Sequence, residues 1–422
     1  MLGTDLGEQY LLMLPLLLSG RGARAYLHGV AYMHLDARFR PLGRKRLLLC
    51  RPPPHVLPSP ALMLTQGLDP REAEQAPCEL EFHIRIRRLF AERPCLVTYS
   101  MGYLEALDAI GLRTFCSASI FTGLEHIVDV RQAVDAVRLF TGVSSGPHDL
   151  LSTARRAGFQ APVGRGVHAG RLDALAFLLT AMVRSHPQLM AFCHTALGAQ
   201  AAWLDAACRS GECCLYLQGT HPQPGLCLGF ARERMKLSIL TCGSELQVLH
   251  LALHRHPLLC PEQVLTTARQ RRLGLDLETV RAQLTRAAAA GAGSLPQREQ
   301  GFFEDALHRL PAADGDFYRR FAGSDPRALM ETPLCLSHEL RLRHLLFKGD
   351  NLPAVMTDAE QDRYRRCCAA LIEAQLPAYV RAVARLREHP AYGDARSCSC
   401  LQALADYPAA LSQPGTWLRA QR

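Results

Sequence analysis

Residues 10–20 of the chain read YLLMLPLLLSG, an apolar run that extends without a break from Leu11 to Leu18. The residues before it carry Asp5 and Glu8 but no Lys or Arg, whereas a secretory signal has a positive leader. A membrane span needs about 20 apolar residues, and this run is much shorter. Pro15 disfavours a helix. The run therefore predicts a buried strand, with Pro15 at an edge or a bulge.

The composition is that of a globular protein rather than a disordered one, with 48% hydrophobic and 21% charged residues. A length of 422 residues predicts two or three domains. The 48 basic residues exceed the 39 acidic ones and give a net charge of +9. This excess suits a polyanionic partner such as nucleic acid, and an Arg-rich solvated surface would explain it equally well.

The sixteen cysteines are not spaced as metal ligands. Cys213 and Cys214 are adjacent, Cys398 and Cys400 are separated by one residue, and no pair has the two-residue gap typical of zinc sites. With no targeting segment recognised, we expect a cytoplasmic protein in a reducing compartment, with buried apolar thiols.

The first part of the chain predicts an α/β domain. Alternating and apolar segments indicate three strands within residues 10–52, joined by tight turns. Asp69-Pro70 is typical of a helix start. A helix is predicted over residues 79–92, a buried strand over 94–100, and an apolar helix over 173–186 that Pro187 ends.

The remainder divides into a β-rich part and a helical part. Residues 213–230 predict two strands across a His-Pro-Gln-Pro-Gly turn at 221–225, and residues 235–257 predict further strands. A helix follows over 275–290 with Asp276 as its N-cap, and residues 301–422 predict helices.

This order of elements resembles the ribonuclease-H-like exonucleases, and particular segments resemble the bacterial exodeoxyribonuclease I family. They are RFRPLGRKRLLLCRPPPHVLPSPALMLTQGLDPREA (38–73), HLALHRHPLLCPEQVL (250–265), ARQRRLGLDLETVRAQL (268–284), EQGFFEDALHRL (299–310) and RLRHLLFKGDNLPAVMTDAEQDRYRR (341–366). The resemblance implies a ribonuclease-H-like exonuclease domain at residues 1–190, an SH3-like domain at 200–296 and a helical domain at 300–422. It also implies a monomer outside the membrane, with a positively charged groove for single-stranded DNA and Mg²⁺-dependent 3′–5′ exodeoxyribonuclease activity.

The family's metal-binding Asp-x-Glu falls on the opening strand. Aligning strand to strand places Leu14 and Leu16 at those two positions, with Pro15 between them. The carboxylates of the family hold two divalent ions, and oxygen atoms are the ligands that Mg²⁺ requires. A leucine offers no lone pair, so the first strand is predicted not to bind metal.

The other motif positions are mixed. Glu105 stands where the family has a metal-binding Asp, and it also fits an ordinary surface residue. His168 and Asp173 have the spacing of the family's His-x4-Asp, in which the His is the general base and the Asp a metal ligand. A gap-free alignment anchored on Pro187 would place Arg171 at the aspartate instead.

Basic residues supply the candidate binding surfaces. The candidate DNA contacts are Arg341, Arg343, Lys348, Arg363 and Tyr364, with Asp350 in the gap where the family has a basic pair. The candidate contacts for the acidic tail of single-stranded-DNA-binding protein are Arg255, Arg269, Arg271 and Arg272. A solvated charged face is the alternative reading of these arginines.

Three hypotheses follow. The first is an exodeoxyribonuclease-I-like pseudoenzyme that binds single-stranded DNA without hydrolysing it. The second is an active 3′–5′ exonuclease with an atypical Mg²⁺ site, and the third is a decaying copy with no DNA role. Loss of the first-strand carboxylates favours the pseudoenzyme, because metal ligands contribute orders of magnitude to phosphodiester hydrolysis.

Overall fold

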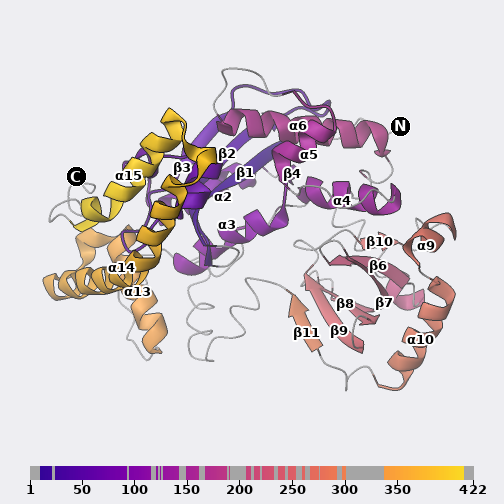
Figure 1. Cartoon of the computed structure of the whole chain (residues 1–422). Helices are drawn as coiled ribbons and strands as arrows, with labels where there is room; N and C mark the ends of the chain where they lie inside the picture. The colour runs from indigo at the N-terminus through magenta and orange to yellow at the C-terminus, as the bar shows by residue number, and fades with distance from the viewer. Residues whose placement is uncertain are drawn as a thin grey trace.

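The computed structural model describes residues 10–20, 24–92, 95–115, 120–121, 124, 127–141, 149–160, 167–187, 190, 206–210, 213–218, 221–231, 236–242, 246–252, 259–261, 267–274, 276–291, 297–300 and 337–412. A five-stranded sheet has the strand order β3-β2-β1-β4-β5 (Figure 1). Neighbours β1, β2 and β3 are antiparallel, whereas β4 and β5 run parallel to β1. The bounds are β1 Tyr10–Ser19, β2 Tyr26–Leu35, β3 Arg46–Leu49, β4 Cys95–Thr98 and β5 Ile127–Asp129.

The opening apolar run forms a buried strand, as predicted, and all of its residues from Tyr10 to Leu18 are buried. It is the central strand of this sheet. Pro15 lies in a part of β1 that is not paired with β4. The parallel pairing with β4 ends at Leu12, so Pro15 pairs only with Val30 of β2, and a register shift follows directly after Leu16. The missing N–H of Pro15 therefore interrupts no hydrogen bonding to β4.

Helices cover both faces of this sheet. On one face, Leu11 and Met13 of β1 pack with Phe82 of α2 and Leu107 of α3. On the other face, Leu12 and its even-numbered neighbours pack with α5 and α6. The bounds are α1 Pro60–Gln66, η2 Pro70–Ala73, α2 Glu79–Ala91, α3 Met101–Arg113, α4 Val130–Thr141, α5 Leu150–Arg156 and α6 Val167–Ser185. The helix start predicted at Asp69-Pro70 is a single 3-10 turn, capped by the Asp69 side chain.

A second sheet of six strands has the order β10-β6-β7-β8-β9-β11. The turn predicted at residues 221–225 is wrong, because those residues begin β7 and Gln218 pairs with His221. Asp276 is the N-cap of α10, as predicted, and accepts hydrogen bonds from the N–H groups of Glu278 and Thr279. The bounds are β6 Cys213–Gln218, β7 His221–Ala231, β8 Lys236–Cys242, β9 Leu246–Ala252, β10 Leu259–Pro261, β11 Gln297–Gln300, α9 Thr267–Leu273 and α10 Leu277–Ala289.

The C-terminal helices fold back onto the first sheet, away from the second one (Figure 1). Leu16 and Leu18 of β1 share a buried cluster with Tyr379 of α14 and Leu404 of α15. The Tyr379 hydroxyl donates a hydrogen bond of 2.6 Å to the Leu404 carbonyl. The bounds are α13 His338–Asn351, η8 Pro353–Val355, α14 Asp358–Arg387, η9 Pro390–Tyr392 and α15 Ala395–Ser412. Within the described residues, α14 alone has the length and apolar composition that a membrane-crossing helix needs.

Candidate functional site

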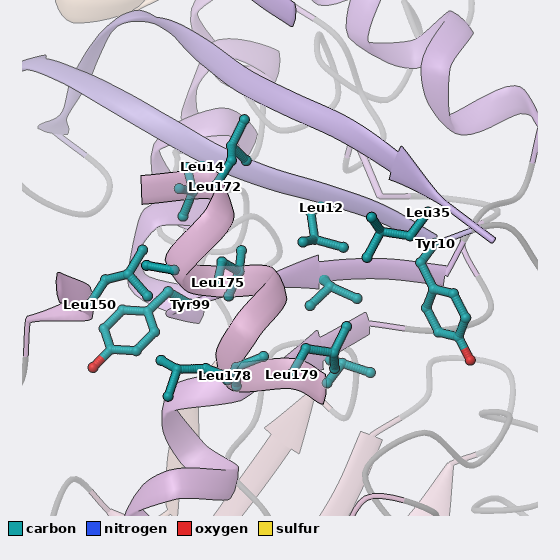
Figure 2. Close-up of a cluster of buried hydrophobic side chains, with 14 of the residues drawn as sticks. Tyr10, Leu12, Leu14, Leu35, Tyr99, Leu150, Leu172, Leu175, Leu178 and Leu179 are labelled. Carbon is teal, nitrogen blue, oxygen red and sulfur yellow. The ribbon is translucent and has the colours of Figure 1, made fainter. Parts of the chain in front are cut away.

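Leu14 and Leu16, which the resemblance places at the family's Asp-x-Glu positions, are core residues. Leu14 is 2% exposed and Leu16 is 1% exposed. Two residues apart on a regular part of β1, they point to the same face of the sheet. Leu14 lies against Leu172 of α6 (Figure 2), in the cluster that also holds Leu175. Leu16 packs in the adjacent cluster with the C-terminal helices. Apolar contacts therefore surround both side chains.

Glu105 is exposed on α3. Its neighbours Leu104, Ala106 and Leu107 are buried in the cluster on the opposite face of the sheet from Leu14. The helix that carries Glu105 therefore packs on the other side of the sheet from the helix that carries His168 and Asp173.

Asp173 is half-buried on α6 and forms an ion pair with Lys45, whose Nζ lies 2.5 Å from the Asp173 Oδ1. Lys45 precedes β3 directly, and the sequence alone did not single it out. The ammonium group therefore already neutralises the one carboxylate that α6 contributes.

His168 is half-buried near the start of α6. Burial, and then the positive charges of Arg171 and Arg396, lower the pKa of His168 to about 4. Its Nδ1 is buried and has no hydrogen-bond partner among the described residues. The imidazole is therefore neutral at neutral pH.

A second buried imidazole, that of His28 on β2, was also missed from the sequence. It is fully buried, and neither ring nitrogen has a hydrogen-bond partner in the part of the chain that the structure describes. Burial, and then His168, lower the pKa of His28 to about 4, while Asp69 acts in the opposite direction. Asp69 is itself paired with Arg71 at 2.6 Å. In the sequence, His28 is one residue of an alternating strand pattern, and that pattern does not indicate that His168 and Asp69 lie near it.

These residues do not fit a two-metal site. Leu14 and Leu16 have no donor atoms, and Asp173 is paired with Lys45. Across the described ranges, no three His, Cys, Asp or Glu side chains are placed to share a metal ion. No hydrolytic step through Mg²⁺ follows from this donor set.

The five candidate DNA contacts divide by exposure. Arg341 and Arg363 are exposed, and so is Arg343, which pairs with Glu339 at 2.6 Å. Lys348 is buried and pairs with Glu360 at 2.7 Å. Tyr364 is buried too. Because both side chains are buried, Lys348 and Tyr364 are unsuited to contact single-stranded DNA, and we exclude them from the proposed contact surface.

Of the four candidate partner-binding arginines, Arg271 is exposed on α9. Arg269 and Arg272 belong to the same helix, but their side chains lie outside the described part. Arg255 lies outside the described residues altogether.

Comparison with known proteins decides the fold. No protein-family model matches the sequence, and no curated protein matches it. A product-bound structure of exonuclease I matches with a TM-score of 0.75 and 16% identity, over 96% of this chain and 100% of that chain. E. coli exonuclease I in complex with a dA16 oligonucleotide matches with a TM-score of 0.71 and 15% identity, over 96% and 100% of the two chains. The chain has an exonuclease I-like fold.

A third exonuclease I structure, a complex designated ExoI/SSB-Ct, matches with a TM-score of 0.73 and 16% identity, over 97% of this chain and 100% of that chain. The exonuclease I-like fold confirms the resemblance that the sequence segments indicated, and the structure has a mixed α/β sheet and helical content. At 15–16% identity these structures show the fold of this chain and not its activity. What the site can do chemically depends on the side chains described above.

Within this exonuclease I-like fold, Asp350 joins the C-terminal helices to the segment between β3 and α1. Its carboxylate accepts a hydrogen bond of 2.6 Å from the Tyr364 hydroxyl. Gly349 makes this possible, because a Cβ there would lie 2.2 Å from the Tyr364 ring. The Asp350 Oδ2 lies 3.8 Å from the His55 Nδ1. Asp350 therefore forms a buried contact between α13, α14 and the segment that holds His55.

Burial raises the pKa of Asp350 to about 8. The hydrogen bond from Tyr364 opposes this rise, as do the positive charges of Arg51 and Arg113, whereas Glu79 adds to it. Burial and the charge of Arg113 lower the pKa of His55 to about 4. At neutral pH the contact between Asp350 and His55 is therefore one between two predominantly uncharged groups.

These pKa values predict a pH dependence of stability. Burial also lowers the pKa of His83 to about 4, as it does for His28, His55 and His168. These histidines bind fewer protons when folded, so their contribution makes stability rise between pH 4 and 6.5. Asp350 holds a proton that the unfolded chain releases, so its contribution falls as the pH rises from about 4 to 8.

Between pH 6.5 and 8 the contribution of Asp350 to stability should fall by about 1–2 kcal/mol, while each of the four histidines, still half protonated in the unfolded chain at pH 6.5, adds about 0.4 kcal/mol. The stability of the parent should therefore stay nearly level over this range, and that of Asp350→Asn should rise. Urea denaturation of the parent and of Asp350→Asn at both pH values measures this difference. Asp362→Asn is the matched control, because Asp362 is 61% exposed. The same change in stability between the two pH values in Asp350→Asn and in the parent would show that Asp350 does not titrate in this range.

Proposed function

We propose that this chain is an exonuclease-I-like protein that binds single-stranded DNA and does not hydrolyse it. The observation that carries the proposal is the burial of Leu14 and Leu16 at the family's Asp-x-Glu positions. Phosphodiester hydrolysis by two metal ions needs oxygen ligands that hold both ions in place. Two leucines that pack into the domain core supply none.

Strand binding does not depend on those carboxylates. Single strands are held by phosphate contacts and by base stacking. The net charge of +9 and the exposed Arg341 and Arg363 support such contacts here. The likeness to exonuclease I structures in complex with oligonucleotides supports the same ligand class.

The proposal extends to domains and partners. It divides the chain into an exonuclease-like domain at 1–190, an SH3-like domain at 200–296 and a helical domain at 300–422. The fold likeness to the ExoI/SSB-Ct complex supports an acidic-tail partner, and the exposed Arg271 on α9 is a candidate contact. The alternative, an active exonuclease with an atypical site, draws support from His168 and Asp173, which lie together on α6.

A fluorescence-anisotropy titration with a labelled single-stranded oligonucleotide tests the binding half of the proposal. We expect modest affinity that falls steeply with salt, by about 0.7 in log K per unit log[salt] for each phosphate contact. The double variant Arg341→Met/Arg363→Met should bind more weakly and with a shallower slope. Arg87→Met/Arg88→Met, at two exposed arginines of α2, is the matched control and should bind as the parent does. Absence of binding at low salt would refute the proposed function.

A further inference from the structure

Strand β3 lies at one edge of the first sheet and pairs with β2 on its inner side. This pairing extends back along the chain beyond β3. The Leu42 N–H donates a hydrogen bond of 2.9 Å to the His34 carbonyl of β2, and Pro41 forms an isolated bridge with Leu35. Residues 41–49 therefore form one border of the sheet, which we call the β3 edge.

The backbone of the β3 edge presents hydrogen-bonding groups outward. The Cys50 N–H donates a hydrogen bond of 2.9 Å to a β2 carbonyl, so the Cys50 backbone faces β2. In an antiparallel ladder this direction alternates from residue to residue, so Leu47 and Leu49 point their N–H and C=O groups away from β2. The Arg51 N–H, which continues this outward series, already donates to the Pro77 carbonyl at 2.8 Å. Among the described residues, no other segment forms a backbone hydrogen bond with Leu47 or Leu49, and such an edge is a template for a further strand.

The β3 edge also exposes apolar side chains. Leu42 is 49% exposed and Leu47 is 43% exposed. Along residues 36–49, all of which are described, no aromatic side chain is exposed, because Phe39 packs against Tyr10 with their ring centroids 4.9 Å apart. The edge therefore offers leucines to an apolar side chain, and it offers no ring on which a base could stack.

The charge along this edge is positive and largely uncompensated. Arg38, Arg44 and Arg46 are exposed, and none of them has an ion-pair partner among the described residues. Their neighbours Arg40 and Lys45 differ, because each already pairs with an aspartate. Three positive charges are therefore available to an anionic partner.

These features together favour one class of partner. A second copy of this chain is disfavoured, because its own β3 edge would bring like charges together, and charged side chains on an edge strand oppose such pairing. Single-stranded DNA would contact the arginines but would leave the outward backbone groups and the leucines unused. An extended acidic peptide uses all three, because strand addition satisfies the backbone while carboxylates and apolar side chains meet the arginines and leucines.

We propose that the β3 edge binds an extended acidic segment of a partner protein, which adds to the first sheet as a further strand. Side-chain alternation defines the pattern of that segment. Leu47 pairs with Ala31 of the cluster that contains α6, whereas Arg46 pairs with Tyr32 of the cluster on the opposite face. Because directly opposite residues of neighbouring strands share a face, the segment should alternate apolar residues opposite Leu47 with acidic residues opposite Arg46. The inference goes beyond the proposed function and concerns a different surface from Arg271 on α9.

Fluorescence-anisotropy titrations with a short labelled peptide that alternates glutamate and valine test the inference. The parent should bind this peptide, and Arg44→Met/Arg46→Met should bind it about tenfold more weakly. The control Arg87→Met/Arg88→Met removes the same charge from exposed positions of α2 and should bind as the parent does. A parent that does not bind the peptide, or equal losses in the two double variants, would overturn the inference.

Methylation of the peptide nitrogens separates strand addition from charge attraction. On an added strand the N–H groups of alternate residues face β3, so methylating one set of nitrogens, valine or glutamate, should abolish binding while methylating the other is tolerated. Equal affinities of the two methylated peptides would overturn the inference. An oligonucleotide that displaces the peptide, or that loses as much affinity as the peptide in Arg44→Met/Arg46→Met, would assign the edge to nucleic acid and overturn it too. Peptide binding by a parent that binds no DNA would support the inference and refute only the proposed function.

Discussion

Leu14→Asp should destabilise the first domain severely rather than recreate a metal ligand. Leu14 is 2% exposed and packs against α6 in the main cluster of the first sheet. An isolated carboxylate in such surroundings is either ionised at a high solvation cost or protonated with an unsatisfied hydroxyl. We expect a loss of about 4 kcal/mol or more in the free energy of unfolding, as measured by urea denaturation with circular dichroism.

Two controls isolate burial as the cause. Leu47→Asp makes the same chemical change on the same sheet, but Leu47 is 43% exposed, so its effect should be small. Leu14→Met roughly conserves volume and should cost less than about 1.5 kcal/mol. If Leu14→Asp were as stable as Leu47→Asp and its melting temperature rose with Mn²⁺, Leu14 would line an open metal site, contrary to the structure.

Strand β1 was predictable because the apolar run that indicates it consists of consecutive residues in the sequence. Eight apolar residues closed by Ser19 and Gly20 can form little other than a buried strand. The position of Pro15 followed from its missing N–H, and the structure places it beyond the β4 pairing and just before a register shift. The sequence was sufficient to predict this strand and the constraint on Pro15, because both depend on local backbone chemistry.

The β-hairpin at residues 213–231 shows where turn composition misleads. His221 to Gly225 contain two prolines and a glycine, which are typical of a turn. In the structure these residues start β7 and pair with β6. Tertiary pairing outweighed local propensity. Helix α1, which lies between Pro60 and Gln66 in a proline-rich segment, was missed for a similar reason.

The candidate site was harder to predict because exposure and pairing depend on distant segments. Lys348 and Tyr364 lie in a basic helical sequence, yet both are buried by contacts between α13 and α14. Gly349 permits the close approach of Tyr364, and a sequence pattern does not state what a glycine faces. Lys45 was one basic residue of four in Arg44–Lys45–Arg46 and Arg51, and only the structure shows which of them faces Asp173.

The largest functional effect that the structure predicts is the loss of hydrolysis itself. Divalent ions activate the attacking water and stabilise the leaving oxygen, and no side chain at these positions replaces both roles. The pKa of about 4 makes His168 a weak base, and its partner positions on β1 are apolar. We expect a rate several orders of magnitude below that of an active exonuclease I.

Digestion of a 3′-labelled single strand in Mg²⁺ or Mn²⁺, at a protein concentration that saturates binding of the same strand, tests this most directly. E. coli exonuclease I in the same buffer serves as the positive control. We predict a strand that is bound but not shortened above background. Reproducible, metal-dependent shortening that disappears in His168→Ala or Asp173→Ala would contradict the account and show an active exonuclease with an atypical site.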